Sequence, residues 1–335
     1  MNTLKINGIG MVTALGLNKK ATSAAFRAGI ENFQESHFLD GNGEKLLVAE
    51  IPLEKPWRGK VKMLKMAARA ILEANSEANL DQKQEIPTLI CLSEKNGLGL
   101  ELDEQQFFND LQQETGVIFH QDSGLIRKGK SGCVSALQYA QTHINNNPQH
   151  LVRIVATDTL LTARLVNKFT ENRWLLTRTT SNGFIPGEAA VCMIFSKKTP
   201  ESTFSLLGKG SADESYKEGD EVPFLAEGLT AAVKQTLQSA KQELSGINLW
   251  FSHNSTTYLS AKESTLTELK LLRGEEIQFQ RHSLTQSFGE VGASAGLLML
   301  ALSKDLLPFG GTSLITMANF DSRRAALLSR VEHYG

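Results

Sequence analysis

The sequence lacks most of the features that mark secreted, membrane-spanning or nucleic-acid-binding proteins. Its 335 residues include only three cysteines, an odd and widely spaced set that fits neither a disulfide framework nor a zinc site. The formal net charge is -1 and no basic stripe is evident, so nucleic acid is a poor partner. The most apolar run, residues 295–302, is too short to span a bilayer, and no signal segment opens the chain. We therefore expect a cytoplasmic protein without a metal or cofactor.

Short runs rich in valine and isoleucine alternate with helix-length amphipathic segments, which is typical of an α/β protein with a largely parallel sheet. The predicted strands are 4–12, 45–52, 87–93, 150–158, 189–196, 204–210, 247–252, 276–280 and 312–320. The main predicted helices are 61–78, 134–146, 225–244 and 292–304. In 61–78 the methionines, Ile71, Leu72 and the alanines form one apolar face, with Lys62 placed elsewhere.

The chain divides best at the polar segment 197–204, which contains a proline. We therefore predict an N-terminal half at 1–198 and a C-terminal half at 199–335. Each half begins with a glycine-punctuated strand, INGIG and LLGKG, and continues through similar alternations. An internal structural duplication is the prediction.

Residues 124–141, GLIRKGKSGCVSALQYAQ, allow two chemistries. Gly124, Gly129, Lys130 and Ser131 satisfy the phosphate-binding pattern G-x-x-x-x-G-K-[ST], which requires a strand before it, for which 116–121 is the candidate. Alternatively, Cys133 opens a helix, where a thiolate nucleophile is stabilised. The bulky residues inside the phosphate pattern weigh against the first interpretation.

Five segments, in order, resemble the β-ketoacyl synthases (3-oxoacyl-ACP synthases) of the thiolase superfamily: INGIGMVTALG (6–16), NGFIPGEAAVCMIF (182–195), SHNSTT (252–257), FGEVGASAG (288–296) and ANFDSRRAALL (318–328). The resemblance spans nearly the whole chain. It implies a thiolase-like fold, in which two duplicated halves stack as five layers, αβαβα. It also implies a homo- or heterodimer, an acyl carrier protein or synthase-like partner subunit, and a place in fatty acid or polyketide biosynthesis.

The resemblance implies a catalytic set that this sequence retains only in part. The family nucleophile motif fits around residue 133 in two registers, which place either Cys133 or Lys130 at the nucleophile position. His253 matches the first catalytic histidine, whereas Glu290 stands where the second is expected. A carboxylate does not replace a neutral imidazole that stabilises an enolate.

Two further positions follow from the resemblance. Phe320 is retained in the oxyanion and pocket loop, but the two glycines after it are Asp321 and Ser322, so the loop is expected to be rebuilt. Glu188 matches a family glutamate that supports the site by hydrogen bonds and does no chemistry.

The sequence therefore predicts a β-ketoacyl-synthase-like protein whose condensing machinery is degenerate and which acts as a non-catalytic partner or accessory subunit. One alternative is an active acyltransferase or condensing enzyme that uses Cys133 and His253, assisted by Glu290, on acyl-ACP or acyl-CoA thioesters. The other is a nucleotide-binding protein that uses the loop GLIRKGKS.

Overall fold

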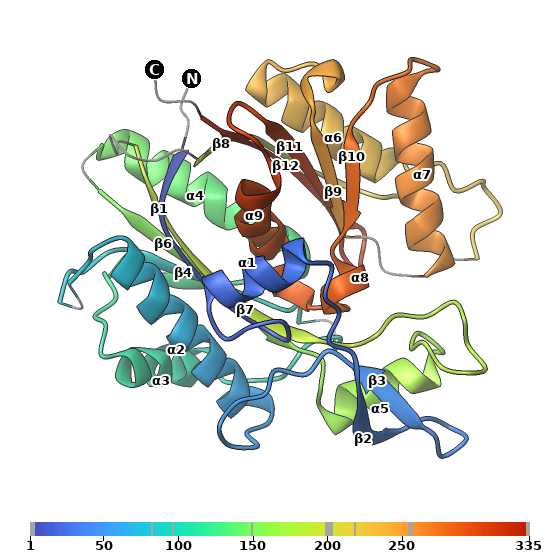
Figure 1. Ribbon diagram of the computed structural model, residues 1–335, viewed down its shortest axis with the longest axis horizontal. Helices are drawn as coiled ribbons and strands as arrows, with labels where there is room; N and C mark the ends of the chain where they lie inside the picture. Colours follow the sequence, from blue (N-terminus) through green and yellow to red (C-terminus); the bar gives the residue numbers. More distant parts are fainter. Residues whose placement is uncertain are drawn as a thin grey trace.

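A ten-stranded mixed sheet runs through the molecule and is flanked by helices (Figure 1). The computed structural model describes residues 4–81, 83–95, 97–148, 150–197, 204–217, 219–253 and 257–332. The strands of the sheet lie in the order β10-β9-β11-β12-β8-β1-β7-β6-β4-β5, and β2 and β3 form a separate hairpin. Within these ranges, no helix is both long and apolar enough to cross a membrane.

The strands are β1 (Leu4–Thr13), β2 (Gln34–Leu39), β3 (Lys45–Val48), β4 (Thr88–Leu92), β5 (Gly124–Arg127), β6 (Val152–Thr159), β7 (Glu188–Ser196), β8 (Phe204–Asp213), β9 (Leu249–His253), β10 (Gln280–Ser283), β11 (Thr312–Ala318) and β12 (Arg323–Val331). The helices are α1 (Lys19–Arg27), α2 (Gly59–Glu77), α3 (Glu104–Thr115), α4 (Gly132–Asn146), α5 (Ala163–Glu171), α6 (Glu227–Ala240), α7 (Tyr258–Leu272), α8 (Thr285–Phe288) and α9 (Ala295–Leu306). Short 3-10 turns η1 (Gly129–Ser131), η2 (Leu244–Gly246) and η3 (Gly292–Ser294) complete the description.

The two halves of the chain repeat one strand order. In the first half β4 pairs in parallel with β5 and β6, and antiparallel pairs then join β6 to β7 and β7 to β1. In the second half β9 pairs in parallel with β10 and β11, and antiparallel pairs join β11 to β12 and β12 to β8. The predicted duplication is thus confirmed. The halves meet where Leu4 and Lys5 of β1 pair with Leu206 and Ser205 of β8.

The buried side chains form layers, as expected for strands whose residues alternate between two faces. Helices α2 and α3 cover one face of the first half, and α6 covers one face of the second half (Figure 1). Between the halves, α4 and α9 share a single apolar cluster with strands of both. The result is the five-layer αβαβα arrangement.

Glycines in β1 and β8, the first strands of the two halves, allow helices α2 and α6 to pack closely on these strands. A Cβ built on Gly10 of β1 would lie 2.0 Å from the carbonyl oxygen of Ala70 in α2. The same relation holds in the second half, where a Cβ on Gly210 of β8 would lie 2.4 Å from the carbonyl oxygen of Ala232 in α6. INGIG and LLGKG are therefore equivalent helix contacts in the duplicated halves.

Most predicted elements are confirmed, and the errors have local causes. The strand predicted at 276–280 lies later, as β10, because this edge segment is largely exposed and has little apolar patterning. Residues 116–121 form a loop after α3, and 45–52 contributes only the short β3 to the hairpin. In α2, Leu72 is exposed while Lys62 is buried in an ion pair. The half boundary predicted at 198/199 lies outside the described residues.

Candidate functional site

Three segments bring Lys130, His253 and Glu290 together in the centre of the molecule. Lys130 lies in η1, which begins at Gly129 with a φ of 57° and leads into α4. His253 is the last residue of β9, opposite Met317 of β11. Glu290 is held by its main chain, which donates to the carbonyl of Ile185 and accepts from the N–H of Gly187.

Lys130 and His253 contact opposite oxygens of the Glu290 carboxylate. The Lys130 Nζ lies 2.9 Å from Oε2, and the His253 Nε2 lies 3.2 Å from Oε1, which also accepts from the N–H of Gly292 at 3.0 Å. All three side chains are buried, and Glu290 has no exposed surface. The histidine contact falls outside hydrogen-bond geometry, and within the described ranges neither ring nitrogen of His253 has a hydrogen-bond partner.

The buried cluster holds opposite charges rather than a pair of neutral imidazoles. Burial alone would raise the pKa of Glu290, but the adjacent His253 and Lys130 lower it below its ordinary value. Burial lowers the pKa of His253, although Glu290 partly opposes this change. Glu290 is thus held as a carboxylate, whereas burial disfavours the protonated form of His253.

Cys133 lies one turn farther along, in the apolar core. Its Sγ is 3.2 Å from the carbonyl oxygen of Lys130 and 3.7 Å from the sulfur of Met317. A Cβ built on Gly296 of α9 would lie 2.4 Å from this sulfur. The side chain is fully buried, and desolvation raises the pKa of its thiol to about 12. These surroundings disfavour the thiolate that nucleophilic attack requires.

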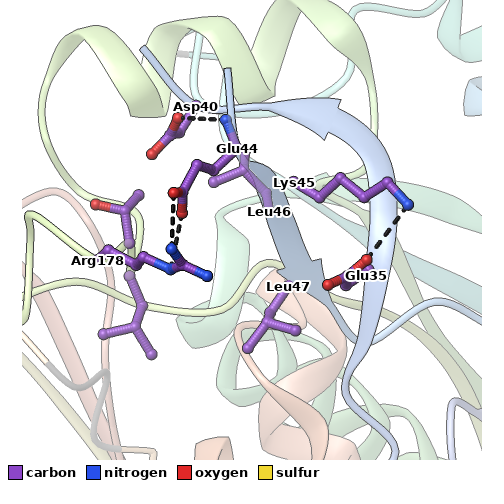
Figure 2. A pocket seen from close by; sticks show the side chains of 9 residues that line it. Glu35, Asp40, Glu44, Lys45, Leu46, Leu47 and Arg178 are labelled. Carbon is purple, nitrogen blue, oxygen red and sulfur yellow. Dashed lines mark hydrogen bonds and ion pairs between the residues drawn. The ribbon is translucent and has the colours of Figure 1, made fainter. Parts of the chain in front are cut away.

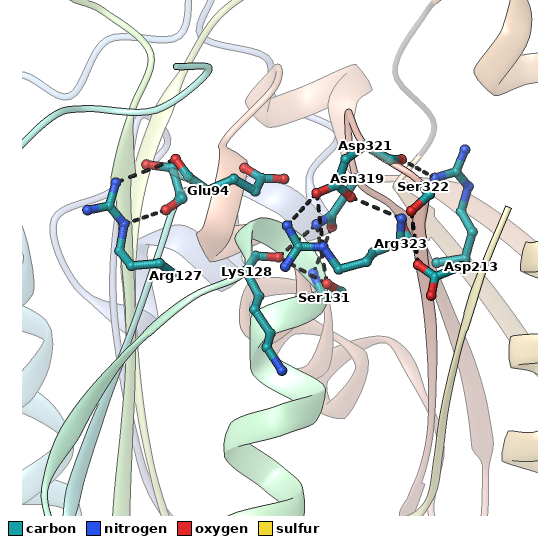
Figure 3. A network of polar contacts seen from close by, with 11 residues as sticks. Glu94, Arg127, Lys128, Ser131, Asp213, Asn319, Asp321, Ser322 and Arg323 are labelled. Atoms are coloured by element: carbon teal, nitrogen blue, oxygen red, sulfur yellow. Dashed lines mark hydrogen bonds and ion pairs between the residues drawn. The ribbon is translucent and has the colours of Figure 1, made fainter. Parts of the chain in front are cut away.

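The loop that carries Phe320, Asp321 and Ser322 is fastened at several points (Figure 3). Asn319 accepts from the N–H of Ser131 at 2.9 Å and donates to the carbonyl of Lys128 at 2.7 Å. The Asp321 carboxylate accepts from Arg323 Nε at 2.9 Å, and the Ser322 hydroxyl donates to Asp213 at 3.0 Å. Asp321 and Ser322, which stand where the resemblance implies glycines, therefore add side-chain bonds to this loop.

Phe320 itself points into an aromatic cluster. Its ring stacks on Trp174 with a centroid distance of 5.7 Å and an interplanar angle of 5°. Phe169 and Phe184 also contact it, at 6.1 and 5.7 Å. The Lys130 ammonium lies 4.3 Å from the ring centroid on another side. The loop, the lysine and the aromatic cluster thus form one contact network.

Glu188 lies at the start of β7 and joins three segments. Its carboxylate accepts from the N–H of Ile51 and from the hydroxyl of Thr159, both at 2.8 Å, and pairs with Lys62. These contacts tie the start of β7 to Ile51, Thr159 and Lys62. The side chain does not contact Lys130, Glu290 or His253 in any described bond.

The lysine of the phosphate pattern is not available to a nucleotide. Gly124–Arg127 form strand β5, paired in parallel with β4, so half of the pattern is sheet rather than loop. Lys130 is bound to Glu290, and the N–H of Ser131 is bound to Asn319. A phosphate cradle needs free N–H groups after a strand, which this geometry does not offer.

Sequence reasoning identified each member of the central cluster but missed the bond between them. One of the two motif registers pointed to Lys130, and ungapped counting pointed to Glu290. The signal that the sequence offered was the opposite charge of these two residues, Lys130 and Glu290, each of which stands at a position that the resemblance assigns to the catalytic site. Asp158, whose carboxylate accepts from the N–H of Ala293, and Glu94, which lies against Gly129, were not predicted as site residues.

A separate surface cavity of about 580 Å³ lies between the β2–β3 hairpin and residues 176–178 (Figure 2). Glu44 pairs there with Arg178, and Lys45 with Glu35. The central lysine, histidine and glutamate do not line it. Across the described residues, no group of three or more His, Cys, Asp or Glu side chains is arranged to hold a metal.

Comparisons with known proteins were made by sequence and by structure. No protein-family model and no curated protein matches the sequence. A type II polyketide ketosynthase, solved with its acyl-carrier protein and bound to the hexaketide, superposes with a TM-score of 0.79 at 14% identity, covering 98% of this chain and 99% of that one.

Two further solved structures are similar over their full lengths. One is a β-ketoacyl synthase from Burkholderia phymatum, with a TM-score of 0.75, 16% identity and coverage of 99% and 100% of the two chains. The other is a ketosynthase in complex with its chain length factor from Xenorhabdus doucetiae, with a TM-score of 0.73, 16% identity and 98% coverage of both chains. The chain therefore has the thiolase-like fold of the ketosynthases.

Proposed function

We propose that this protein is a ketosynthase-like subunit that performs no condensation and acts beside an active condensing chain. The observation that carries the proposal is the buried ion pair between Lys130 and Glu290. Both residues stand where the family resemblance expects reactive groups, a nucleophile in one register and the second histidine. A charged lysine bonded to a carboxylate offers neither a thiolate nor a neutral donor for an enolate.

The fastened loop also supports this proposal. Phe320 stacks on Trp174, and Asn319 bonds the loop to η1, so any acyl chain that approached Lys130 would have to break several contacts. The buried state of Cys133 supports the same conclusion, because its raised thiol pKa weakens the alternative of acyl transfer.

Two features support a partner role: the solved structures that the fold is similar to, and the position of β5 at the edge of the sheet. The similar structures include a ketosynthase with its acyl-carrier protein and another with its chain length factor. In this chain β5 is the last strand of the sheet and has β4 as its one described neighbour. Its outer edge offers unpaired main-chain groups, a common means of joining sheets between subunits.

The catalytic claim is tested by intact-mass spectrometry. The protein is incubated with malonyl- and acyl-CoA and with acyl-loaded carrier protein, and the expected result is no covalent adduct. Cys91→Ala, which removes another buried cysteine, is the matched control for Cys133→Ala. An adduct that forms on the native protein and on Cys91→Ala but disappears in Cys133→Ala would establish the acyltransferase alternative instead.

The partner claim is tested separately. The tagged chain is purified from its native host, and the expected companion is a ketosynthase that retains a cysteine and two histidines, in a fixed ratio. Condensation by that ketosynthase should fall at least about tenfold when this chain is withheld, since pairing of subunits couples their stability. Full activity of the ketosynthase alone would contradict the proposed role.

A further inference from the structure

Glu94 is a buried carboxylate, one oxygen of which has no hydrogen-bond partner among the described residues. The residue is 5% exposed, and its Oε1 has no described bond. Glu94 lies just after β4. It also lines a surface cavity of about 370 Å³ together with Lys95, Glu101 and Arg127. A buried acceptor without a donor costs free energy, so its retention needs an explanation.

The position of Glu94 relates it directly to Lys130. A Cβ built on Gly129 would lie 2.3 Å from the Glu94 Oε1, so the carboxylate rests against the residue that precedes the lysine. Only a glycine permits this approach, and Gly129 also has a positive φ. Figure 3 shows the Glu94 side chain extending away from Arg127 toward the loop at Asn319 and Asp321.

Burial raises the pKa of Glu94, and the charges of Lys130 and Arg323 oppose this shift. Arg323 also lies within electrostatic range, but its guanidinium is bound to Asp321. Arg127 donates to the main-chain carbonyls of Ser93, Glu94 and Leu100 and not to the carboxylate. Lys130 is therefore the cation best placed to pair with Glu94.

We propose that Lys130 exchanges between two carboxylates, Glu290 in the observed state and Glu94 in a second state. Its long side chain allows the ammonium to move while η1 and its glycine stay in place. In the second state Glu290 and His253 lose their cation, and the ammonium leaves the face of Phe320. This exchange would thus couple the segment at Glu94, beside the 370 Å³ cavity, to the aromatic cluster that contacts Phe320.

Glu94 is able to accept the lysine, although the observed state, with Lys130 paired to Glu290, is the more stable of the two. Burial raises the pKa of Glu94, so a cation that reaches this carboxyl group would stabilise its ionised form. When the lysine arrives, its ammonium pairs with the ionised carboxylate of Glu94. This inference goes beyond the proposed function and does not depend on it, since a condensing or a non-condensing chain would equally carry the switch.

The switch is tested by a double-mutant comparison of thermal midpoints. Glu94→Gln alone should shift the midpoint by less than about 2 °C, because the lysine is then on Glu290. On a Glu290→Gln background the same change should lower it by at least about 5 °C, because the buried lysine then loses its last carboxylate. Glu214→Gln is the control and should shift both backgrounds equally, because this buried carboxylate accepts from the N–H groups of Gly228 and Tyr216 and makes no described contact with Lys130 or Glu290.

A crystal structure of Glu290→Gln gives the direct measurement. The expected result is the Lys130 Nζ within hydrogen-bond distance of Glu94. If Glu290→Gln does not fold, Glu290→Asp keeps the charge but shortens the side chain, and Lys130 should then lie on Glu94 as well. Equal effects of Glu94→Gln in both backgrounds, or a lysine that remains at residue 290 in these crystals, would overturn the proposal.

Discussion

The stability of the central cluster depends on charges that compensate each other in a dry environment. Lys130→Met leaves Glu290 buried with no amine beside it, and we expect this to lower the free energy of unfolding by about 3 to 5 kcal/mol. Replacing both residues, as Lys130→Met with Glu290→Met, should restore most of the loss, because no charge then needs desolvation. Urea unfolding of the native, single and double variants measures this difference.

Lys65 provides the control for that prediction, since it pairs with Glu114 in a partly exposed position. Lys65→Met should cost less than about 1 kcal/mol, as for most surface ion pairs. A double variant at 130 and 290 that is as unstable as Lys130→Met would contradict the compensation argument and would indicate that packing alone is at fault.

Asp158 gives the protein a predictable dependence on pH. Burial, together with the charges of Glu94 and Glu290, raises its pKa from 3.8 to about 7, although N–H groups of Ala293 and Thr159 oppose the shift. An acid with a raised pKa in the folded state is more stable when protonated. Its contribution is therefore complete below about pH 4 and is lost as pH rises to about 7.

Asp158→Asn should remove that dependence. Relative to the variant, the native protein should lose up to about 4 kcal/mol of unfolding free energy between pH 4 and 7 and then stay constant. Urea midpoints at half-unit pH steps measure the difference between the two proteins. A difference that does not vary with pH would show that folding leaves the pKa of this carboxyl group unchanged.

At the scale of elements, the glycines of β1 and β8 decide how closely α2 and α6 approach the sheet. Gly10→Ala places a methyl group on the Ala70 carbonyl, which cannot move without shifting the helix. We expect a loss of about 2 kcal/mol or more in unfolding free energy, and the same for Gly210→Ala. Gly41→Ala, where a Cβ meets nothing within 4 Å, should be neutral.

The elements that the sequence predicted well are those with strong patterns and deep burial. Strands β4, β6 and β7 are buried along their whole lengths, and their predicted ranges agree within one or two residues. Helix α7 was not predicted, because only Glu263 and Thr267 are buried along it. Edge strands such as β5 and β10 are four residues long, which is too short for a periodic signal.

At the scale of the whole molecule, the central layer should make unfolding cooperative. The largest apolar cluster joins side chains of α4 and α9 to strands of both halves, so neither half has a complete core by itself. Variants that retain only Trp57 in the first half, or only Trp250 in the second, should report the same urea midpoint. Two separate midpoints would mean that the halves are independent domains.

The sequence by itself determined the α/β alternation, the duplicated halves and the identities of the charged residues near the centre. These properties follow from periodicity, glycine placement and ordered motifs, which are local features of the chain. Only the tertiary structure decided that Lys130, rather than Cys133, faces Glu290 and His253. The two candidates are three residues apart, about one helical turn, so local pattern does not separate them. They differ in their surroundings. Cys133 packs against Met317 and Gly296, whereas Lys130 meets the carboxylate of Glu290 from the other half of the chain.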